Sequence, residues 1–485
     1  MNYRMLCRIS GMVLLLEAGF LLLPFIVSLQ YREHGSAIAF GEGLLITLAV
    51  GALLFFVLSK GAKPGFYARE GLVVTGICWI IMSAFGAIPF VLNGDIPSYV
   101  DAFFEMASGF TTTGSSIIDN VETMTHGTLF WRSFSNWIGG MGVLVFLLAI
   151  MPSAGKQAGF TLHILRAESP GPSVGKIVPK MKETAKILYF MYIGITVLDI
   201  IFLKIGGLPL FEAVCHAFST AGTGGYGVKA DSFASYSPYV QNVTTIFMLL
   251  FGVNFSIYYL ILLKKVKDII HDEEVRLYIF TVLAAGLLIG WNIRSLYPTV
   301  EETLRKSFFQ VASMITTTGF ATADFDSWPV FSKTLILLLM MIGACAGSTG
   351  GGMKCARVLI LFKSLLMNIR RNIHPRTVHV LKINNRVVSE DVIINTHAYF
   401  SAYVIIIAVV TALISFDGYS IETNLSAAFA TFNNIGPGLG SVGPTLNFAG
   451  YSDFSKILLS LAMITGRLEI FPILSLFSRS TWKKI

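Results

Sequence analysis

Charged residues are scarce in this chain of 485 residues: Asp, Glu, Lys and Arg make up 13% of it, whereas apolar residues make up 54%. The mean hydropathy of +0.69 lies outside the range of soluble domains. This composition excludes an ordinary soluble enzyme, and the length leaves room for many spans of about 20 residues each. The sequence therefore indicates a polytopic membrane protein.

Cysteine is also rare, and its placement predicts neither a disulfide framework nor a metal site. The five cysteines are odd in number, scattered and mostly inside apolar stretches: Cys7, Cys78, Cys215, Cys345 and Cys355. Neither a His-Glu-x-x-His nor a Cys-x-x-Cys motif occurs. We therefore expect neither a bound organic cofactor nor enzymatic activity. The alternative, a membrane enzyme, would be indicated by turnover in the absence of any ion gradient.

Hydropathy predicts ten spans, at 11–30, 40–59, 71–92, 127–151, 184–206, 238–263, 276–297, 330–362, 393–416 and 452–477. Lys and Arg gather in six stretches that fall on one side if every segment spans: 1–10, 60–70, 152–187, 264–276, 363–391 and 478–485. The positive-inside rule then places both termini in the cytoplasm. The net charge of +8 is explained by this topology and requires no nucleic-acid partner. Acidic residues dominate the other side, where they raise the local concentration of cations.

Four of the outward loops share one pattern, a short semi-apolar segment followed by a stretch rich in Thr and Gly. The short segments are 101–110, 210–220, 303–315 and 422–432. Alignment on the glycine pairs Thr113-Gly114, Thr223-Gly224, Thr318-Gly319 and Ile435-Gly436, at spacings of 110, 95 and 117 residues. A unit of span, half-helix, glycine turn and span therefore occurs four times.

A half-helix of about ten residues is too short to cross a bilayer, so its non-helical end must be buried in protein or line a watery cavity. Four such ends converge naturally on a pseudo-fourfold axis, with their partly negative C-termini aimed inward at a cation. Glycine lets the following backbone turn its carbonyls toward the axis, and rings of carbonyls can replace the water around a monovalent cation. The alternative is that these glycines only permit tight helix packing.

A glycine-rich interruption, 343–354, divides the predicted span 330–362. The stretch Gly347 to Lys354 comes close to a phosphate-binding loop, but Met353 separates Gly352 from the lysine, and neither Ser nor Thr follows it. Counted inward from Val330, the run lies about halfway across the membrane, and each glycine there costs a helix roughly 1 kcal/mol. We expect it to unwind into a loop under the ring of carbonyls.

Together, six motifs resemble the TrkH/KtrB/HKT superfamily of potassium transporters over essentially the whole chain: ASGFTTTGS (107–115), HAFSTAGTGGYG (216–227), ASMITTTGFATADF (312–325), GACAGSTGGGMK (343–354), FNNIGPGLGSVGP (432–444) and GRLEIFP (466–472). The two spans before the first repeat place it in the TrkH branch. The resemblance implies an all-α polytopic membrane protein, with two N-terminal spans and four M1–pore-helix–M2 repeats around a pseudo-fourfold ion pore. The implied divisions are an N-terminal domain at 1–60 and pore repeats at 61–160, 161–264, 265–385 and 386–485.

The resemblance also implies function: potassium uptake across the cell (inner) membrane through a gated, potassium-selective pore, with potassium as the transported substrate. The implied selectivity filter comprises Thr112, Thr113, Gly114, Thr223, Gly224, Thr317, Thr318, Gly319, Asn434, Ile435 and Gly436. The fourth repeat departs from the family pattern, because it has Asn-Asn-Ile-Gly in place of Thr-Thr-Thr-Gly. The implied gate is the loop 343–352, through Gly343, Gly347, Gly350, Gly351 and Gly352. A secondary transporter for sodium or ammonium remains the alternative.

The partners implied by the resemblance are a second copy of the chain and a cytosolic ring of TrkA-type (RCK) subunits that binds NAD or ATP. The basic residues of 363–391 fit either docking of such a partner or topogenic charge against anionic lipid headgroups.

Arg467 is a charged residue in the middle of the last predicted span. Burying it in a span costs roughly 2.5–3.5 kcal/mol even on insertion scales, so it is expected to face a cavity rather than lipid. Glu469 is close in sequence but about 200° away around a helix, so the two cannot share a face. About 15 positions after Asp453, Arg467 is expected level with the 343–352 loop, bonded to carbonyls that the unwound loop exposes. A salt bridge to another helix, or snorkelling to the surface, is the alternative.

Overall fold

The computed structural model describes residues 1–61, 68–142, 181–377 and 379–482. In this part of the chain nearly all regular structure is α-helical, and one antiparallel pair of two-residue strands is present, β1 (Lys382–Ile383) with β2 (Arg386–Val387). Six of the described helices are long and apolar enough to cross a membrane, or seven if one sharply bent pair counts as a span. The predicted class, an all-α polytopic membrane protein, is confirmed.

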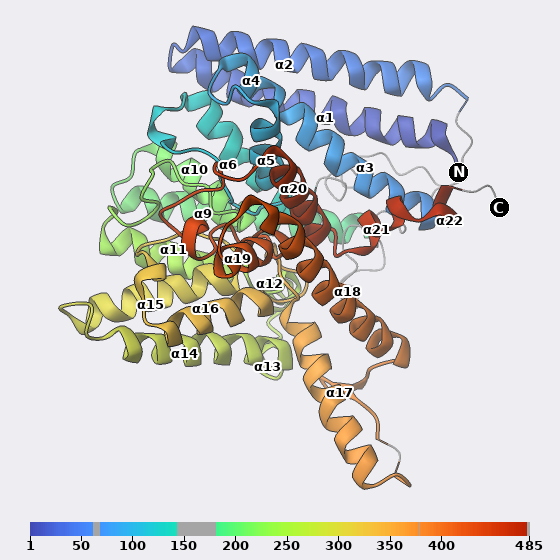
Figure 1. The fold of residues 1–485 in the computed structure, drawn as a ribbon, viewed down its shortest axis with the longest axis vertical. Helices are drawn as coiled ribbons and strands as arrows, with labels where there is room; N and C mark the ends of the chain where they lie inside the picture. The colour runs from blue at the N-terminus through green and yellow to red at the C-terminus, as the bar shows by residue number, and fades with distance from the viewer. Residues whose placement is uncertain (62–67, 143–180, 378, 483–485) are drawn as a thin grey trace.

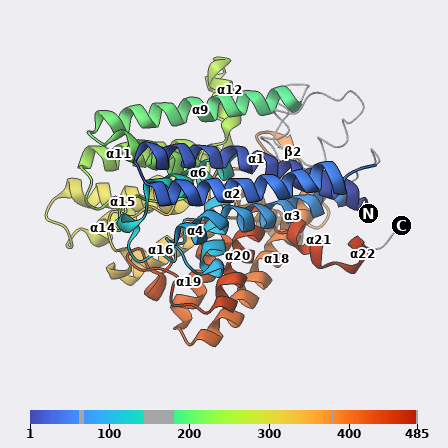
Figure 2. The same ribbon diagram turned by 90° about the horizontal axis from the view of Figure 1, so that it is seen from above.

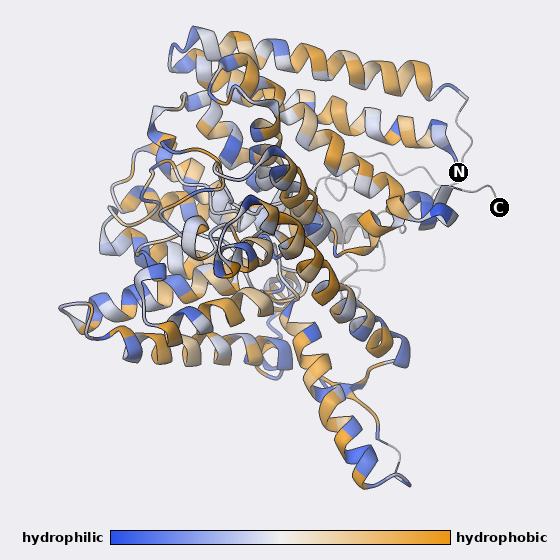
Figure 3. Cartoon of the chain, viewed as in Figure 1, coloured by the Kyte–Doolittle hydropathy of each residue, from blue (hydrophilic) through white to orange (hydrophobic). Residues whose placement is uncertain are grey.

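Two N-terminal helices form a hairpin at one edge of the molecule, as Figures 1 and 2 show. They are α1 (Tyr3–Gln30) and α2 (His34–Ala52), the latter continuing as a π-helix over Leu53–Leu58. Large apolar side chains such as Phe56 on this hairpin are exposed, and apolar residues dominate both helices in Figure 3. Such surfaces suit hydrocarbon, and the two predicted N-terminal spans are confirmed.

Four repeats follow, each with a long first helix, a short pore helix and a second helix. The first repeat contains α3 (Ala68–Gly86), α4 (Ile88–Asn93), α5 (Tyr99–Phe110) and α6 (His126–Met141). The second contains α9 (Met181–Ile205), α10 (Leu210–Gly222), α11 (Pro238–Phe251) and α12 (Phe255–Leu262). A short helix, α13 (Val266–Ile270), connects it to the third, which contains α14 (Glu273–Ile293), α15 (Val300–Ile315), α16 (Val330–Ile342) and α17 (Cys355–Ile373). The fourth contains α18 (Glu390–Ile414), α19 (Ile421–Phe432), α20 (Asp453–Arg467), α21 (Phe471–Phe477) and α22 (Arg479–Trp482).

The four pore helices, α5, α10, α15 and α19, lie where the half-helices were predicted. Three of them begin at a Ser or Thr whose hydroxyl accepts a backbone N–H of the first turn: Ser98, Thr299 and Ser420. All four have an acidic residue in the first turn, which complements the positive end of the helix dipole. Capping hydroxyls thus mark the starts of three pore helices, whereas α10 begins after Pro209 without a side-chain cap.

The second helix of each repeat ends inside its predicted span; the glycine-rich sequence predicts the break in 330–362, whereas those in 127–151, 238–263 and 452–477 were not predicted. α6 ends before Gly142, α11 and α12 meet at 90° around Gly252, α16 ends before Gly343, and α20 ends at Arg467. Hydropathy cannot detect such breaks, because the residues around them remain apolar. Residues 143–151 of the first of these spans lie outside the described residues, as does most of the predicted basic stretch 152–187.

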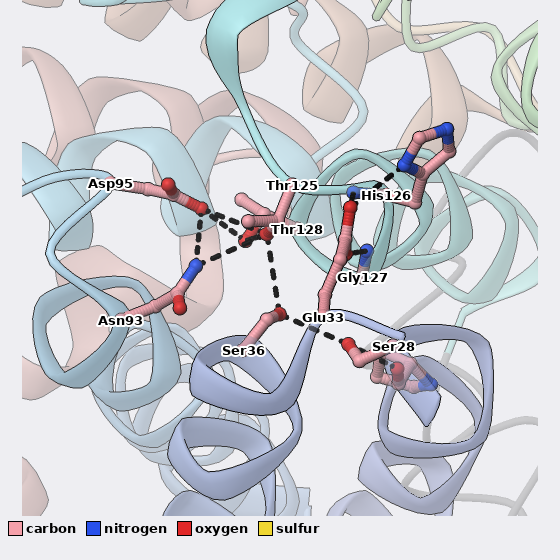
Figure 4. A network of polar contacts seen from close by, with 10 residues as sticks. Ser28, Glu33, Ser36, Asn93, Asp95, Thr125, His126, Gly127 and Thr128 are labelled. Carbon is pink, nitrogen blue, oxygen red and sulfur yellow. Dashed lines mark hydrogen bonds and ion pairs between the residues drawn. The ribbon is translucent and has the colours of Figure 1, made fainter. Parts of the chain in front are cut away.

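A polar network attaches the N-terminal hairpin to the first repeat (Figure 4). The Glu33 carboxylate accepts the backbone N–H of His126 at 3.0 Å and lies 2.8 Å from its Nδ1. Nearby, the hydroxyl of Thr125 lies within hydrogen-bond distance of the Ser36 hydroxyl, at 3.2 Å, and of the Asp95 carboxylate, at 3.1 Å. These contacts join the α1–α2 turn to the start of α6, so the hairpin is held against the pore-forming part by specific bonds.

Candidate ion pore

All four pore helices end in the same backbone turn. Just beyond each helix one non-glycine residue is left-handed, with φ of 55–59°: Thr112, Thr223, Thr317 and Asn434. Two residues later a glycine also has positive φ, of 72–103°: Gly114, Gly225, Gly319 and Gly436. The residue between them donates its N–H back to the pore helix over 2.8–2.9 Å: Thr113, Gly224, Thr318 and Ile435. We call 112–114, 223–225, 317–319 and 434–436 the ring segments, and their last residues the ring glycines.

The second repeat corrects the alignment made from sequence. Thr-Gly matching places Gly224 with Gly114, whereas the structure places Gly224 with Thr113, and Gly225 with Gly114. The turn requires positive φ at its third residue, a conformation that glycine adopts without strain. Because residues 224 and 225 are both glycine, the sequence alone does not show which of them is the third residue of the turn. Gly224 still belongs to the second ring segment.

The ring segments close on one another in a cycle. A Cβ added to any ring glycine would come within less than 3.0 Å of a carbonyl oxygen of the next repeat. Gly114 faces the oxygen of Gly224, Gly225 that of Thr318, Gly319 that of Ile435, and Gly436 that of Thr113. The structure therefore brings together all eleven residues predicted for the filter, and four backbone carbonyls alternate with four glycines around the ring.

Side chains of the ring segments are largely occupied with structural bonds. The Thr113 hydroxyl lies 2.7 Å from that of Thr111, and the Thr318 hydroxyl lies 2.8 Å from that of Thr316. In the fourth repeat the Asn434 amide donates to Thr113 Oγ1 at 2.9 Å, which links the last repeat to the first. The departure from Thr-Thr-Thr-Gly thus supplies a bond between repeats that threonine is too short to make.

The two sides of the ring differ. The segments that leave the ring glycines border a cavity, whose lining includes Gly114, Gly225, Gly319, Gly436 and the exposed Asp119. On the opposite side, residues just before the ring glycines contact the 343–354 loop. Gly351 donates its N–H to Thr317 Oγ1 at 2.6 Å, and Gly352 donates to the carbonyl of Asn433 at 3.1 Å. The loop therefore lies directly beneath the third and fourth ring segments.

The loop is unwound, as predicted, and its backbone groups have partners. Gly343, Gly347 and Gly352 have φ of 73–75°, values that favour glycine. Cys345 donates its N–H to the carbonyl of Gly252 at 3.0 Å, so the loop also contacts the break between α11 and α12. Gly350, another of the predicted gate residues, lies beside Thr316 of the third repeat, and its carbonyl accepts a bond from the Lys354 side chain.

Arg467 lies at the level of the loop, at the C-terminal end of α20. Its Nη1 donates to the carbonyl of Thr349 in the loop at 2.7 Å, and its Nη2 donates to the carbonyl of Gly140 in α6 at 2.7 Å. The guanidinium therefore connects the fourth repeat, the loop and the first repeat. Glu469 lies beyond the end of α20 with a positive φ of 54° and pairs with Arg357, so the expected separation of about 200° around a helix does not apply to it.

Comparison with known proteins decides the family. The family model for TrkH, described as a cation transport protein, matches residues 36–484. This chain belongs to the TrkH family. It is 35% identical to the Trk system potassium uptake protein TrkH of Salmonella typhimurium, over 100% of both chains, and 32% identical to the TrkG protein of Escherichia coli, over 99% of both. The crystal structure of the potassium transporter TrkH from Vibrio parahaemolyticus superposes with a TM-score of 0.87 at 31% identity, covering 100% of both chains.

Several buried or half-buried charges in this TrkH-family chain were missed by sequence reasoning. Glu105 of α5 and Arg132 of α6 form an ion pair beside the ring. Glu274 of α14 accepts the N–H of Ala346 at 2.6 Å and that of Ala356 at 3.1 Å, which holds both ends of the loop region. A usable signal exists, since an ionisable residue inside a membrane segment is by default a functional hypothesis. Sequence reasoning applied that rule only to Arg467.

No group of three or more His, Cys, Asp or Glu side chains that could hold a metal occurs among the described residues.

Proposed function

We propose that this chain mediates potassium uptake across the cell membrane through a selective pore at the four ring segments. The observation that carries the proposal is the closed cycle of glycines and carbonyls contributed by all four repeats. Carbonyl dipoles can replace the hydration shell of a dehydrated monovalent cation, and the four pore helices aim their partly negative ends at the same place. The names of the relatives, potassium uptake proteins and a potassium transporter, support potassium as the ion.

The test is isotope uptake into vesicles that contain the purified protein. Rubidium-86 enters down its gradient, and potassium, sodium and ammonium are added in turn as competitors. We expect potassium to suppress uptake and the other two ions to have little effect. Equal competition by sodium or ammonium would instead favour a transporter for another monovalent cation, and hydrolytic turnover without an ion gradient would favour an enzyme.

We further propose that the 343–354 loop is the gate. Its backbone contacts Thr317 and Asn433 directly beneath the ring, so an ion leaving the ring on that side meets the loop. The bond from Arg467 to Thr349 fastens the loop, and the fixed positive charge repels cations there. Single-channel recording in bilayers of defined ionic composition measures the open fraction on which this proposal depends.

The family resemblance implies the assembly, and the distribution of Lys and Arg along the chain predicts the topology. We propose a homodimer that carries cytosolic TrkA-type subunits binding NAD or ATP, with both termini in the cytoplasm and the divisions at 1–60, 61–160, 161–264, 265–385 and 386–485. The Trk system in the relatives' names supports a system of more than one component. Light scattering of the purified protein tests the dimer. Recording with and without the cytosolic partner, in NAD or ATP, tests regulation, and accessibility of cysteines placed near the termini tests topology.

A further inference from the structure

In three repeats the residue nine positions before the ring glycine is a buried polar side chain that lies against the segment leaving the ring. In the third repeat, Gln310 Nε2 donates to the carbonyl of Phe320 at 3.3 Å. In the second, His216 lies beside Gly227. The fourth repeat has Ala427 at this position, and its neighbour Ser426 accepts the N–H of Leu439 at 2.9 Å instead. We call the residues that follow each ring glycine the exit segment of the chain. In these three repeats the pore helix contacts its exit segment mostly through neutral groups.

The first repeat places a charge at this position. The Glu105 side chain is fully buried and its carboxylate accepts a bond from Arg132 Nε at 2.8 Å. The same carboxylate accepts the hydroxyl of Ser116 at 3.1 Å and the backbone N–H of Ile117 at 3.1 Å. Ser116 and Ile117 are the second and third residues after Gly114, so the ion pair fixes the exit of the first ring segment.

The same pair reaches the second ring segment through Tyr226, which follows Gly225. The guanidinium of Arg132 lies over the Tyr226 ring, 4.1 Å from its centroid. The Tyr226 hydroxyl donates to the backbone carbonyl of Glu105 at 2.6 Å. Arg132 and Tyr226 are each 2% exposed. One buried charge pair therefore determines the positions of two adjacent ring segments.

We propose that Glu105 and Arg132 are positioning residues for ion selectivity: they hold the first and second ring segments at the spacing that favours potassium over sodium. They act through Ser116, Ile117 and Tyr226. Charge-assisted bonds are roughly twice as strong as neutral ones, and a buried charge that loses its partner is costly, so the exit segments have little freedom while the pair is intact. The inference rests on the proposed function, because it concerns how the ring discriminates between ions.

The test is Glu105→Gln in the full-length protein, measured as the potassium-to-sodium permeability ratio in bilayers. Glutamine occupies the equivalent position in the third repeat, so its shape is compatible with a pore helix, but it leaves Arg132 without a carboxylate. We expect the ratio to fall by about fivefold, the factor that corresponds to about 1 kcal/mol. A purely structural role would reduce the amount of folded protein and the total current without changing the ratio.

The matched control is Asp101→Asn on the same pore helix. Asp101 pairs with Lys456 at 2.5 Å and has no recorded bond to an exit segment, so its loss is expected to leave the ratio unchanged. A folded Glu105→Gln protein with the parental ratio would overturn the inference, and so would an equal loss in Asp101→Asn. If the parent itself does not discriminate between the two ions, the proposed function fails and the inference fails with it.

Tyr226→Phe keeps the proposal testable if Glu105→Gln does not fold. This change removes the hydroxyl that donates to the carbonyl of Glu105 at 2.6 Å and lies 3.5 Å from that of Ser115, and the loss of a neutral bond leads us to expect a fall in the ratio of about threefold. An unchanged ratio in Tyr226→Phe, together with failure of Glu105→Gln to fold, would assign the pair a structural role only.

Discussion

The second helices of repeats two and three break at the same level, but the chain between the two halves differs in length and in what it contacts. In the second repeat, three residues separate α11 from α12 and the chain turns by 90°. In the third, residues 343–354 separate α16 from α17, and the extra chain fills the space under the ring. The two breaks also touch, since Cys345 bonds to Gly252 and Phe255 bonds to Gly347. A break is therefore common to both repeats, and in the third the longer intervening chain reaches Thr317 and Asn433 beneath the ring.

The largest effect on potassium flux is expected from a deletion in the 343–354 loop, the longer of the two breaks. Deletion of Ser348–Gly350 removes the loop's bond with Arg467 and draws Gly351 and Gly352 away from Thr317 and Asn433. At about 1 kcal/mol for each of the two neutral bonds and at least about 1.5 kcal/mol for the charged bond from Arg467, the open fraction is expected to rise by about 300-fold or more. Potassium flux without the cytosolic partner measures the change, and the potassium-to-sodium ratio should stay near the parental value.

The control for this deletion is Val253→Ala in the shorter break. Val253 lies in the connection between α11 and α12, and among the described residues no hydrogen bond joins it to a ring segment. This substitution should leave flux unchanged. Loss of flux in a correctly folded deletion protein would show that the loop is a hinge that the pore needs, not an obstruction.

Arg467→Ala should produce the next largest effect. Its bond to Thr349 joins it to the loop, and a hydrogen bond to a charged group contributes about 1.5–3 kcal/mol, so flux should rise by about tenfold or more. Arg467→Lys keeps the charge but loses the forked geometry, and it should fall between the parent and alanine. Isotope uptake and unitary conductance check the order, with the exposed Arg479→Ala as the control. A folded Arg467→Ala protein no more permeable than its parent would make the arginine structural.

The second and third repeats can also be compared at the ring. Ala at Gly225 or Gly319 forces a Cβ against a backbone carbonyl at a positive φ, whereas Ala at Gly224 meets the side chain of Asn136 and needs no left-handed backbone. We therefore expect Gly225→Ala and Gly319→Ala to lower the potassium-to-sodium ratio by more than Gly224→Ala does. A larger loss in Gly224→Ala would restore the alignment made from sequence and contradict the register described above.

Much of this architecture could be predicted because membrane physics leaves strong marks in sequence. Long apolar runs identified α1, α2 and the first helix of every repeat, and the Thr/Gly turns located four pore helices that cannot span. The breaks at Gly252 and Gly343 differ: only the latter carries enough glycines to be recognised. The register of Gly224 and Gly225 depends on a backbone angle that two adjacent glycines leave open. The Glu105–Arg132 pair joins residues of two helices, and sequence gives no sign of which charges meet.

The smallest effect is expected at Glu274, which holds the longer break from outside the ring. One oxygen of its carboxylate accepts both the N–H of Ala346 and that of Ala356, so it links the start of the loop to the first turn of α17. Glu274→Gln removes the charge but keeps an amide oxygen that can still accept, which limits the loss to part of one charged bond. We therefore expect flux without the partner to rise by only about threefold. The adjacent Glu273→Gln is the matched control, because Glu273 binds Lys363 and the N–H of Asn384 and has no recorded bond to the loop. If both variants raise flux equally, the effect comes from the start of α14 in general, and the loop does not depend on the Glu274 carboxylate for its closed position.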